Sequence, residues 1–223
     1  SGETMLGLTP LRHFVSIGAR RGVSPHPVFD VDWYLKSPAV GDGARSNPLL
    51  HYLRTPQAVR QSPCPLFDVP FYLQSNPDVA REGVDPLCHY LSLGGREGRA
   101  PHPLFDGSGY MAANPDVARS GENPLVHFLT FGAREGRSPH PLFDTTFYLE
   151  ANADVRVRAV NPLVHYLFDG WKEGRDPSPS FHTAEYLSLH PELRESDVNP
   201  LLHYVQRYGT AARGRAGGTR RPH

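Results

Sequence analysis

The stretch "NPLVHFLTFGAREGRSPHPLFD", from Asn123 to Asp144, decides the fold because close variants of it recur along the chain. "DPLCHYLSLGGREGRAPHPLFD" begins at Asp85, and "NPLVHYLFDGWKEGRDP" begins at Asn161. The central histidines follow one another at intervals of 38 residues, without slippage: His13, His51, His89, His127, His165 and His203. Columns of phenylalanine, tyrosine and proline keep the same interval. Several independent columns with one period indicate a tandem-repeat protein.

Each unit contains signals for short helices joined by turns. Segments such as "NPLVHFLTF" begin with Asn or Asp followed by proline, which predicts an N-cap and a proline at the first helical position. An Asp before "VPFYLQS" or "TTFYLEA", and an Asn-Pro pair before "DVA", predict two further helix starts: Asp68, Asp106, Asp144, Asn76 and Asn114. We therefore expect two or three short helices in each unit.

Glycine and proline predict how these helices end and connect. One glycine after the histidine helix is expected at the C′ position, where a positive φ costs glycine little: Gly94, Gly132 and Gly170. The glycine of each "EGR" word predicts a second turn: Gly98, Gly136 and Gly174. The prolines of "SPHPLF" and "APHPLF" exclude a helix, so we expect an extended crossover there.

Such short helices are marginally stable alone, so the units must stabilise one another. "PLVHFL" is apolar on nearly every side, and a unit of 38 residues cannot surround it. We therefore predict an all-α, solenoid-like array of stacked units, in preference to one compact globule. Residues 9–209 would form about five units that start and end mid-unit, residues 1–8 an N-terminal extension, and residues 210–223 a disordered basic tail. Pro56 replaces an expected glycine and "SPAVGDGA" near Pro38 blurs a turn, so we expect a bend or altered packing there.

Composition excludes several classes of function. The formal net charge is zero, which gives no reason to expect binding to nucleic acid. There is no apolar run of about 18 residues, so no membrane span is predicted. "SGETMLGLTP" lacks the pattern of a signal peptide, and we expect a cytoplasmic protein. Cys64 and Cys88 are the two cysteines, without the spacing of a metal site or a disulfide framework.

The recurring histidine raises the question of a metal site. Zinc lies about 2.0–2.1 Å from histidine nitrogen, whereas packed helices lie about 8–10 Å apart, so histidines of successive units cannot share an ion. A second ligand would have to come from the "PHP" words, which carry His26, His102 and His140 but have Cys64 and Ser178 in other units. We therefore expect no metal and no cofactor, and interpret the six histidines as structural. Each would donate to carbonyls of the proline-rich crossover.

An enzyme is the least favoured class, because every residue type that could carry chemistry is duplicated at the repeat interval and no catalytic residue stands out. The charged residues of the "EGR" words are the best candidate interaction strip: Glu97, Arg99, Glu135, Arg137, Glu173 and Arg175. They are either solvated turns, with arginine on helix C-terminal carbonyls, or a docking strip for an acidic peptide or a sugar polymer.

The words "PHPLFDTTFYLEANADV" and "NPLVHYLFDGWKEGR" resemble helical repeats of large bacterial proteins of cell-surface polysaccharide synthesis. The pattern of those repeats is similar to "HPLFDxxYYLxxNPDVxxxGxNPLxHYLxxGxxEGRxP", and the likeness extends from about Thr9 to Gly209. Such repeats often accompany glycosyltransferase domains. The resemblance implies an accessory helical region and not the transferase itself. Departures at Pro56, Ser178 and His182 show that the units are not strictly equivalent.

Our first hypothesis is a non-enzymatic scaffold that holds a partner protein or positions an enzyme of surface-polysaccharide synthesis. The second is a carbohydrate-binding array, in which repeated Tyr, Arg and Glu side chains bind a repeating polymer. A further alternative is a part of a glycosyltransferase whose catalytic domain lies outside this chain. Partners would be a protein or a polysaccharide, and the array could also associate end to end.

Overall fold

The computed structural model describes residues 24–209, and in this range it consists of short helices without a strand, which confirms the all-α prediction. His13, the expected extension and the expected basic tail lie outside the described residues. The 38-residue interval divides the described range into five units, which we number in chain order: 24–61, 62–99, 100–137, 138–175 and 176–209.

Units 2, 3 and 4 contain the same four helical segments in the same order. Unit 2 has α4 (Val69–Ser75), α5 (Pro77–Glu82), α6 (Pro86–His89) and η5 (Tyr90–Gly94). Unit 3 has α7 (Gly107–Ala113), α8 (Pro115–Ser120), α9 (Pro124–His127) and η6 (Phe128–Gly132). Unit 4 has α10 (Thr145–Ala151), α11 (Ala153–Val157), α12 (Pro162–His165) and η7 (Tyr166–Gly170).

The two outer units depart from this plan. Unit 1 has α2 (Val31–Lys36), η3 (Asp42–Ser46), α3 (Pro48–Arg54) and η4 (Gln57–Val59). Unit 5 has α13 (Thr183–Leu189), α14 (Glu192–Glu195) and α15 (Pro200–Tyr208). Near Pro38 and Pro56 the local structure departs from the other units, because η3 and η4 are 3₁₀ turns and α3 ends before Pro56.

Most of the predicted helix caps are confirmed. The Asp144 carboxylate accepts a hydrogen bond from the Phe147 N–H at 3.0 Å, and the Asn123 side chain accepts from the Val126 N–H at 3.3 Å. The Asn-Pro start of the third helix differs, because Asn76 does not cap α5. Its side-chain amide donates instead to the Tyr72 carbonyl at 2.7 Å. The helix start was therefore predicted correctly, but the role of the asparagine was not.

In units 2 and 3 the histidine helix continues past its first turn with backbone hydrogen bonds that span five residues instead of four. The Gly95 N–H donates to the Tyr90 carbonyl five residues earlier at 2.8 Å, and the Ala133 N–H donates to the Phe128 carbonyl at 3.0 Å. η5, η6 and η7 are therefore π-helical turns, which are rare and need a local cause.

The prediction of a positive φ at the first glycine column is wrong, because Gly94, Gly132 and Gly170 end π-helical turns and do not have this conformation. The second turn predicted at the "EGR" glycines is confirmed, and Gly98, Gly136 and Gly174 have φ values of 74°, 77° and 74° in it.

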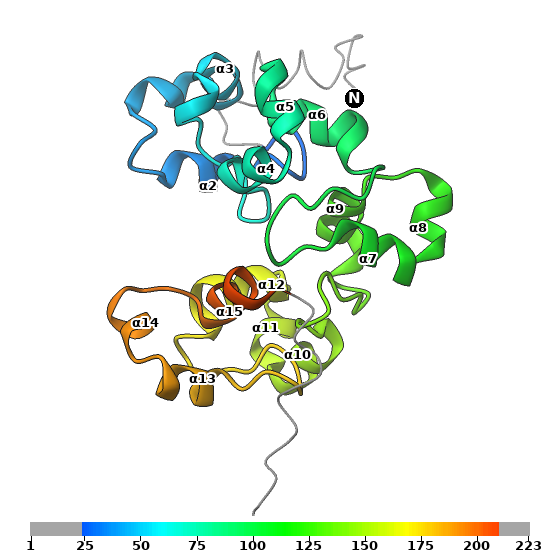
Figure 1. Cartoon of the computed structure of the whole chain (residues 1–223), viewed down its shortest axis with the longest axis vertical. Coiled ribbons are helices and arrows are strands. Elements are labelled where there is room, and N and C mark those ends of the chain that lie inside the picture. The colour runs from blue at the N-terminus through cyan, green and yellow to red at the C-terminus, as the bar shows by residue number, and fades with distance from the viewer. Residues whose placement is uncertain (1–23, 210–223) are drawn as a thin grey trace, which may run out of the picture.

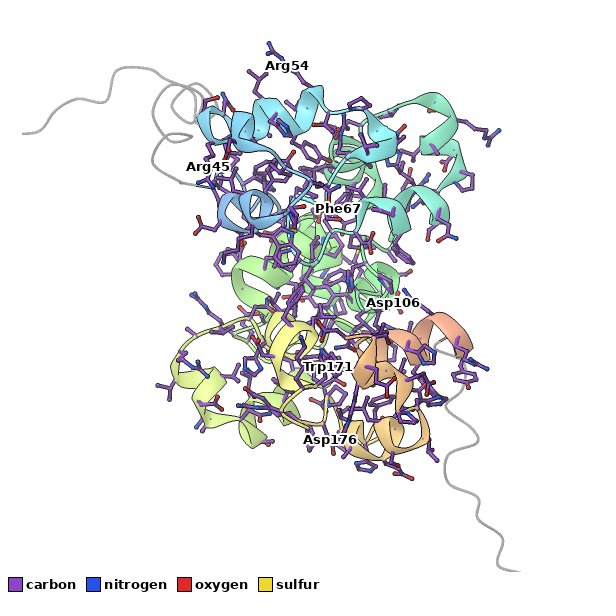
Figure 2. The ribbon with its side chains drawn as sticks, turned by 90° about the vertical axis from the view of Figure 1, so that its left-hand side faces the viewer. Arg45, Arg54, Phe67, Asp106, Trp171 and Asp176 are labelled. Carbon is purple, nitrogen blue, oxygen red and sulfur yellow. The ribbon has the colours of Figure 1, made fainter. Side chains whose placement is uncertain are left out.

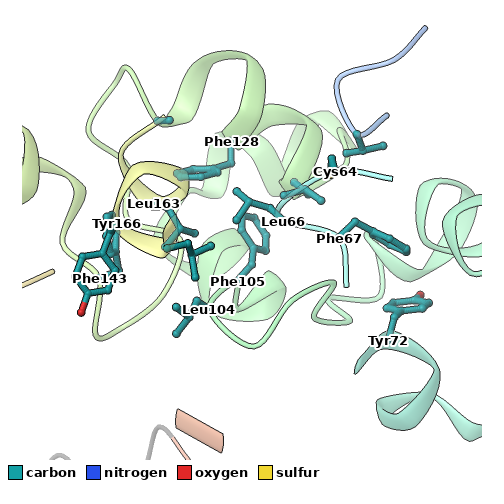
Figure 3. Packing of buried hydrophobic residues seen from close by; sticks show 14 of the residues in the cluster. Cys64, Leu66, Phe67, Tyr72, Leu104, Phe105, Phe128, Phe143, Leu163 and Tyr166 are labelled. Carbon is teal, nitrogen blue, oxygen red and sulfur yellow. The ribbon is translucent and has the colours of Figure 1, made fainter. Parts of the chain in front are cut away.

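Successive units are joined through their crossovers, the "PxPLF" words. The prediction of an extended crossover is wrong, because each word closes a tight turn: the phenylalanine N–H donates to the carbonyl three residues earlier, as from Phe105 to His102 at 2.9 Å. The residue that follows each crossover donates its backbone N–H to a proline carbonyl of the next crossover, with distances of 2.9–3.0 Å: Asp30 to Pro63, Asp68 to Pro101, Asp106 to Pro139 and Asp144 to Pro177. Figure 3 shows Leu66, Phe67, Leu104 and Phe105 of these crossovers within the apolar cluster of the interior. The crossovers thus lie along the interior of the array.

The array winds tightly enough for units that are distant in sequence to meet. The rings of Trp33 in unit 1 and Phe168 in unit 4 lie with their centroids 4.9 Å apart. In Figure 1 the chain passes from α2–α6 at one end, through α7–α9, to α10–α15 at the other end. Figure 2 shows Phe67 and Trp171 near the midline, with helices to either side. The units therefore form a short superhelix around a shared apolar interior.

One column of turn residues differs between units in a way that affects stability. Gly83 and Gly121 end α5 and α8 with φ values of 65° and 70°. The equivalent residues in units 4 and 5 are Ala159 and Asp197, both with a φ of 53°. This left-handed conformation is unfavourable for residues with a Cβ atom.

Ala159→Gly is expected to increase the free energy of unfolding by about 1 kcal/mol, because relief of the left-handed strain exceeds the added flexibility of the unfolded chain. The matched control is Gly121→Ala, whose new Cβ would meet nothing within 4 Å, and which should cost about 1 kcal/mol. Chemical denaturation of the full chain measures both. A stability loss in the first variant would contradict the strain assigned to Ala159.

Candidate functional site

Every described unit contains the same pair of a tyrosine and the repeat histidine, which is buried in units 3 and 4 and partly buried in units 1, 2 and 5. The tyrosine lies on the first helix of the unit and the histidine lies 17 residues later, on the "NPLxHY" helix. The phenol oxygen and the histidine Nδ1 are 2.8 or 2.9 Å apart in each unit: Tyr34–His51, Tyr72–His89, Tyr110–His127, Tyr148–His165 and Tyr186–His203. These histidines thus make the same hydrogen bond in each unit, as a structural role requires, but the partner is a tyrosine and not a crossover carbonyl.

We predicted that the histidine would bond to the carbonyls of the crossover, and this detail is wrong. Burial raises the pKa of the Tyr110 phenol well above its usual value, so the phenol keeps its proton. A protonated phenol can donate to the lone pair of Nδ1, which leaves Nε2 to carry the imidazole proton. The pair joins two helices of one unit, whereas the crossover bonds to its neighbour through the backbone.

The first glycine column is explained by this pair. A Cβ atom on Gly132 would overlap the Tyr110 hydroxyl and approach His127 Nδ1 to 3.2 Å. Gly94 and Gly170 have the same surroundings in units 2 and 4. Glycine is therefore required for space and not for a positive φ. Pro56 and Tyr208 occupy the equivalent positions in units 1 and 5, where the π-helical turn is absent.

An aromatic cluster surrounds the pair in each unit. In unit 3 the ring centroid of Tyr110 lies 5.5 Å from that of Phe105 and 5.9 Å from that of Phe128, and Phe105 lies 5.6 Å from Phe128. The Tyr110–Phe128 contact is edge-to-face, a favourable arrangement for aromatic rings. All three side chains are almost completely buried. The tyrosine column is therefore not available as a sugar-stacking surface in unit 3.

The second histidine column lies in the crossovers. His102 and His140 are buried, and each accepts a backbone N–H through Nδ1, from Leu104 at 3.1 Å and from Leu142 at 3.2 Å. Burial, with a smaller contribution from His140, lowers the pKa of His102 to about 3. This ring is therefore neutral at physiological pH. Cys64 and Ser178 fill the same buried position in units 2 and 5.

The arginines of the predicted interaction strip are bound within their own units. Arg137 donates to the Asn114 side-chain oxygen at 3.1 Å, to the Asp116 carboxylate at 2.8 Å and to Glu135 at 2.6 Å. Arg99 makes the same contacts with Asn76, Asp78 and Glu97, and Arg175 makes them with Asn152, Asp154 and Glu173. We refer to each such group as an arginine clasp. The clasps connect the "EGR" turn to the "NPDV" turn, so these arginines do not contact helix C-terminal carbonyls, which was one of the two alternatives.

The lowered pKa values of the clasp aspartates support these contacts with arginine. The hydrogen bond from Arg137 lowers the pKa of the Asp116 carboxyl to about 2, and Arg99 and Arg175 lower those of Asp78 and Asp154. The glutamates and aspartates of the clasps remain about half exposed, whereas the arginines are largely covered. The acidic rims, and not the arginines, therefore face the solvent.

Sequence reasoning missed two partners that a fixed spacing could have revealed. The tyrosine column precedes the histidine column by 17 residues in each described unit, and the "NPDV" aspartate precedes the "EGR" arginine by 21 residues in units 2–4. Both are recurring pairs of complementary polar groups. The sequence alone did not show that each pair meets in space.

Residues 24–209 contain no group of three or more His, Cys, Asp or Glu side chains placed to hold a metal ion. No helix in this range combines the length and the apolar character needed to cross a bilayer.

Comparison with known proteins gives no assignment. No family model matches the chain, no curated protein matches its sequence, and no solved structure matches its fold.

His127→Ala is expected to lower the free energy of unfolding by about 1–3 kcal/mol, because it leaves the buried Tyr110 hydroxyl without its partner. The control is His182→Ala, which removes an exposed histidine and should change stability by less than about 0.5 kcal/mol. Thermal and chemical denaturation measure both effects. Equal stability of the His127→Ala variant and the parent chain would contradict the structural role of the pair.

Arg137→Gln is expected to raise the pKa of Asp116 from about 2 towards its ordinary value of 3.8. Because the folded-state pKa is below the unfolded value, the parent chain should lose the stability due to this contact as the pH falls from about 4 to about 2, and the variant should lose less. Carboxyl-carbon NMR titration measures the pKa directly. Arg134→Gln, on an exposed arginine outside the clasp, is the control, and an unchanged Asp116 pKa in Arg137→Gln would contradict the assignment.

Proposed function

We propose that this chain is a non-enzymatic helical-repeat scaffold that binds a protein partner. The observation that carries the proposal is that the polar residues that could perform chemistry are bonded to one another within the units. The repeat histidines are bonded to tyrosines in every described unit, and the "EGR" arginines of units 2–4 are bonded in their clasps. These side chains stabilise the individual units instead of converging on one site.

The geometry of the array supports the same proposal. Stacked helical units present an extended surface on a rigid frame, which is the usual way in which repeat proteins bind partners. The described surface carries separate apolar side chains that a partner could cover, including Leu93, Phe131 and Val157, whose exposed fractions are 55%, 52% and 81%. Exposed apolar side chains suit a protein partner better than a polymer of neutral sugars.

The cellular setting follows from the resemblance of the repeats. We place the scaffold in the bacterial cytoplasm, as an accessory to cell-surface polysaccharide or glycosyltransferase machinery. Its role there is to position an enzyme whose catalytic domain is a separate part of the machinery.

Proximity labelling tests this proposal. The full chain, fused to a labelling enzyme, is expressed in a bacterium that carries its gene, with the labelling enzyme alone as the control. The expected result is enrichment of a glycosyltransferase or another enzyme of polysaccharide synthesis. A parallel assay measures retention of purified cell-surface polysaccharide by the purified chain. Retention of polysaccharide without enrichment of any such enzyme would overturn the scaffold in favour of a carbohydrate-binding array.

A further inference from the structure

The outer face of unit 5 has an aromatic cluster that is covered in the interior units. Phe181, Tyr186 and Tyr204 repeat the cluster, with Phe181 centroid distances of 5.3 Å to Tyr186 and 5.6 Å to Tyr204. In unit 4 the equivalent rings, Phe143, Tyr148 and Tyr166, are each 0% exposed. In unit 5 both tyrosines are partly exposed, and the neighbouring Leu189 is 71% exposed.

A cavity of about 460 Å³ lies over this cluster. Its lining includes Phe181, His182, Tyr186, Leu189 and Tyr204, together with Leu142 of the preceding crossover. The cavity therefore lies where the crossover of unit 5 meets α13 and α15. We call this surface the unit-5 groove.

The four junctions between units show what covers such a surface. At each of them the next crossover lies against the preceding one, and its proline carbonyl accepts the N–H of the residue that follows the phenylalanine. His182 is the fifth residue of this donor column, after Asp144 of unit 4. No residue of the described range accepts the His182 backbone N–H.

We infer that the unit-5 groove binds a P-x-P-L-F turn presented by another chain, which would continue the line of crossovers across a protein–protein interface. This inference deepens the proposed scaffold role and rests on it. The bound segment would place a proline carbonyl on the His182 N–H and its apolar side chains on the tyrosine rings. The two prolines restrict the backbone of the segment before it binds, which lowers the entropy cost of binding.

Unit 5 also shows why the interaction is weaker than an internal junction. The leucine column of the crossovers holds Leu66 and Leu104, both 0% exposed, but unit 5 has an exposed Ser180 there. A segment that binds the groove therefore meets less apolar surface than a crossover inside the array. Restoring leucine at this position should strengthen binding.

The test uses a peptide with the sequence of residues 137–144, RSPHPLFD, capped at both ends and titrated into the isotopically labelled full chain. Amide shifts are expected at His182 and at the residues around Leu189, with a dissociation constant in the high micromolar to millimolar range. A peptide with serine for leucine and alanine for phenylalanine is the control ligand. Ser180→Leu is expected to tighten binding about threefold or more, since it adds buried apolar area.

Two exposed positions give matched variants that should not disturb folding. Leu189→Glu places a charge in the groove and should weaken peptide binding at least fivefold. Val157→Glu places the same charge on α11 of unit 4, at a residue that is 81% exposed, and should leave binding unchanged. Circular dichroism checks that both variants are folded.

The outcomes separate the inference from the proposed function. Absence of peptide-induced shifts at unit 5, or equal binding by Leu189→Glu and Val157→Glu, would overturn the inference even if proximity labelling identifies a polysaccharide enzyme. Specific peptide binding that Leu189→Glu abolishes supports the inference. It does so even where no such enzyme is labelled, a result that contradicts only the cellular role.

Discussion

The buried hydrogen bond between tyrosine and histidine is the interaction on which the units depend. A phenol and an imidazole are costly to bury separately, and together they satisfy one polar atom of each inside an aromatic cluster. The pair fixes the distance between the first helix and the "NPLxHY" helix, and in units 2–4 it occupies the space that a side chain on Gly94, Gly132 or Gly170 would need. Three residue types of the interior units are therefore explained by one contact, and the π-helical turn follows the backbone around it.

The regular contacts between units depend mainly on the backbone and not on side chains. Within a unit, side chains of matched chemistry meet; between units, the most regular contact is a backbone N–H to a proline carbonyl. This contact is indifferent to side-chain identity, which explains why the buried crossover position tolerates His102, His140, Cys64 and Ser178. Side-chain contacts between units vary accordingly: Tyr166 bonds to Thr183 at 3.0 Å, whereas Tyr90 faces a unit that has Gly107 at the equivalent position. The array can thus vary its interior while it keeps its spacing.

The sequence is sufficient to predict the helices and the stacking, because caps and periodicity act locally. The prolines exclude a helix in the crossover, but they do not show that it closes a tight turn. The sequence is insufficient where two distant residues share a space. Gly132 was interpreted as a helix end, although the Tyr110 hydroxyl determines its identity. Arg137 was interpreted as a surface charge, although it is bound to Asn114 and Asp116. Both errors have one cause: spacing shows that residues repeat together, and only geometry shows which of them touch.

The meeting of Trp33 with Phe168 has a consequence for the energetics of the whole chain. A linear repeat protein is well described by the intrinsic stability of each module and its coupling to immediate neighbours, so that modules can be removed one at a time at a constant cost. Here the first described module also touches the fourth. Deleting an internal module would break that long-range closure as well as two local couplings, so the chain should melt as a more cooperative body than a one-dimensional stack of the same length.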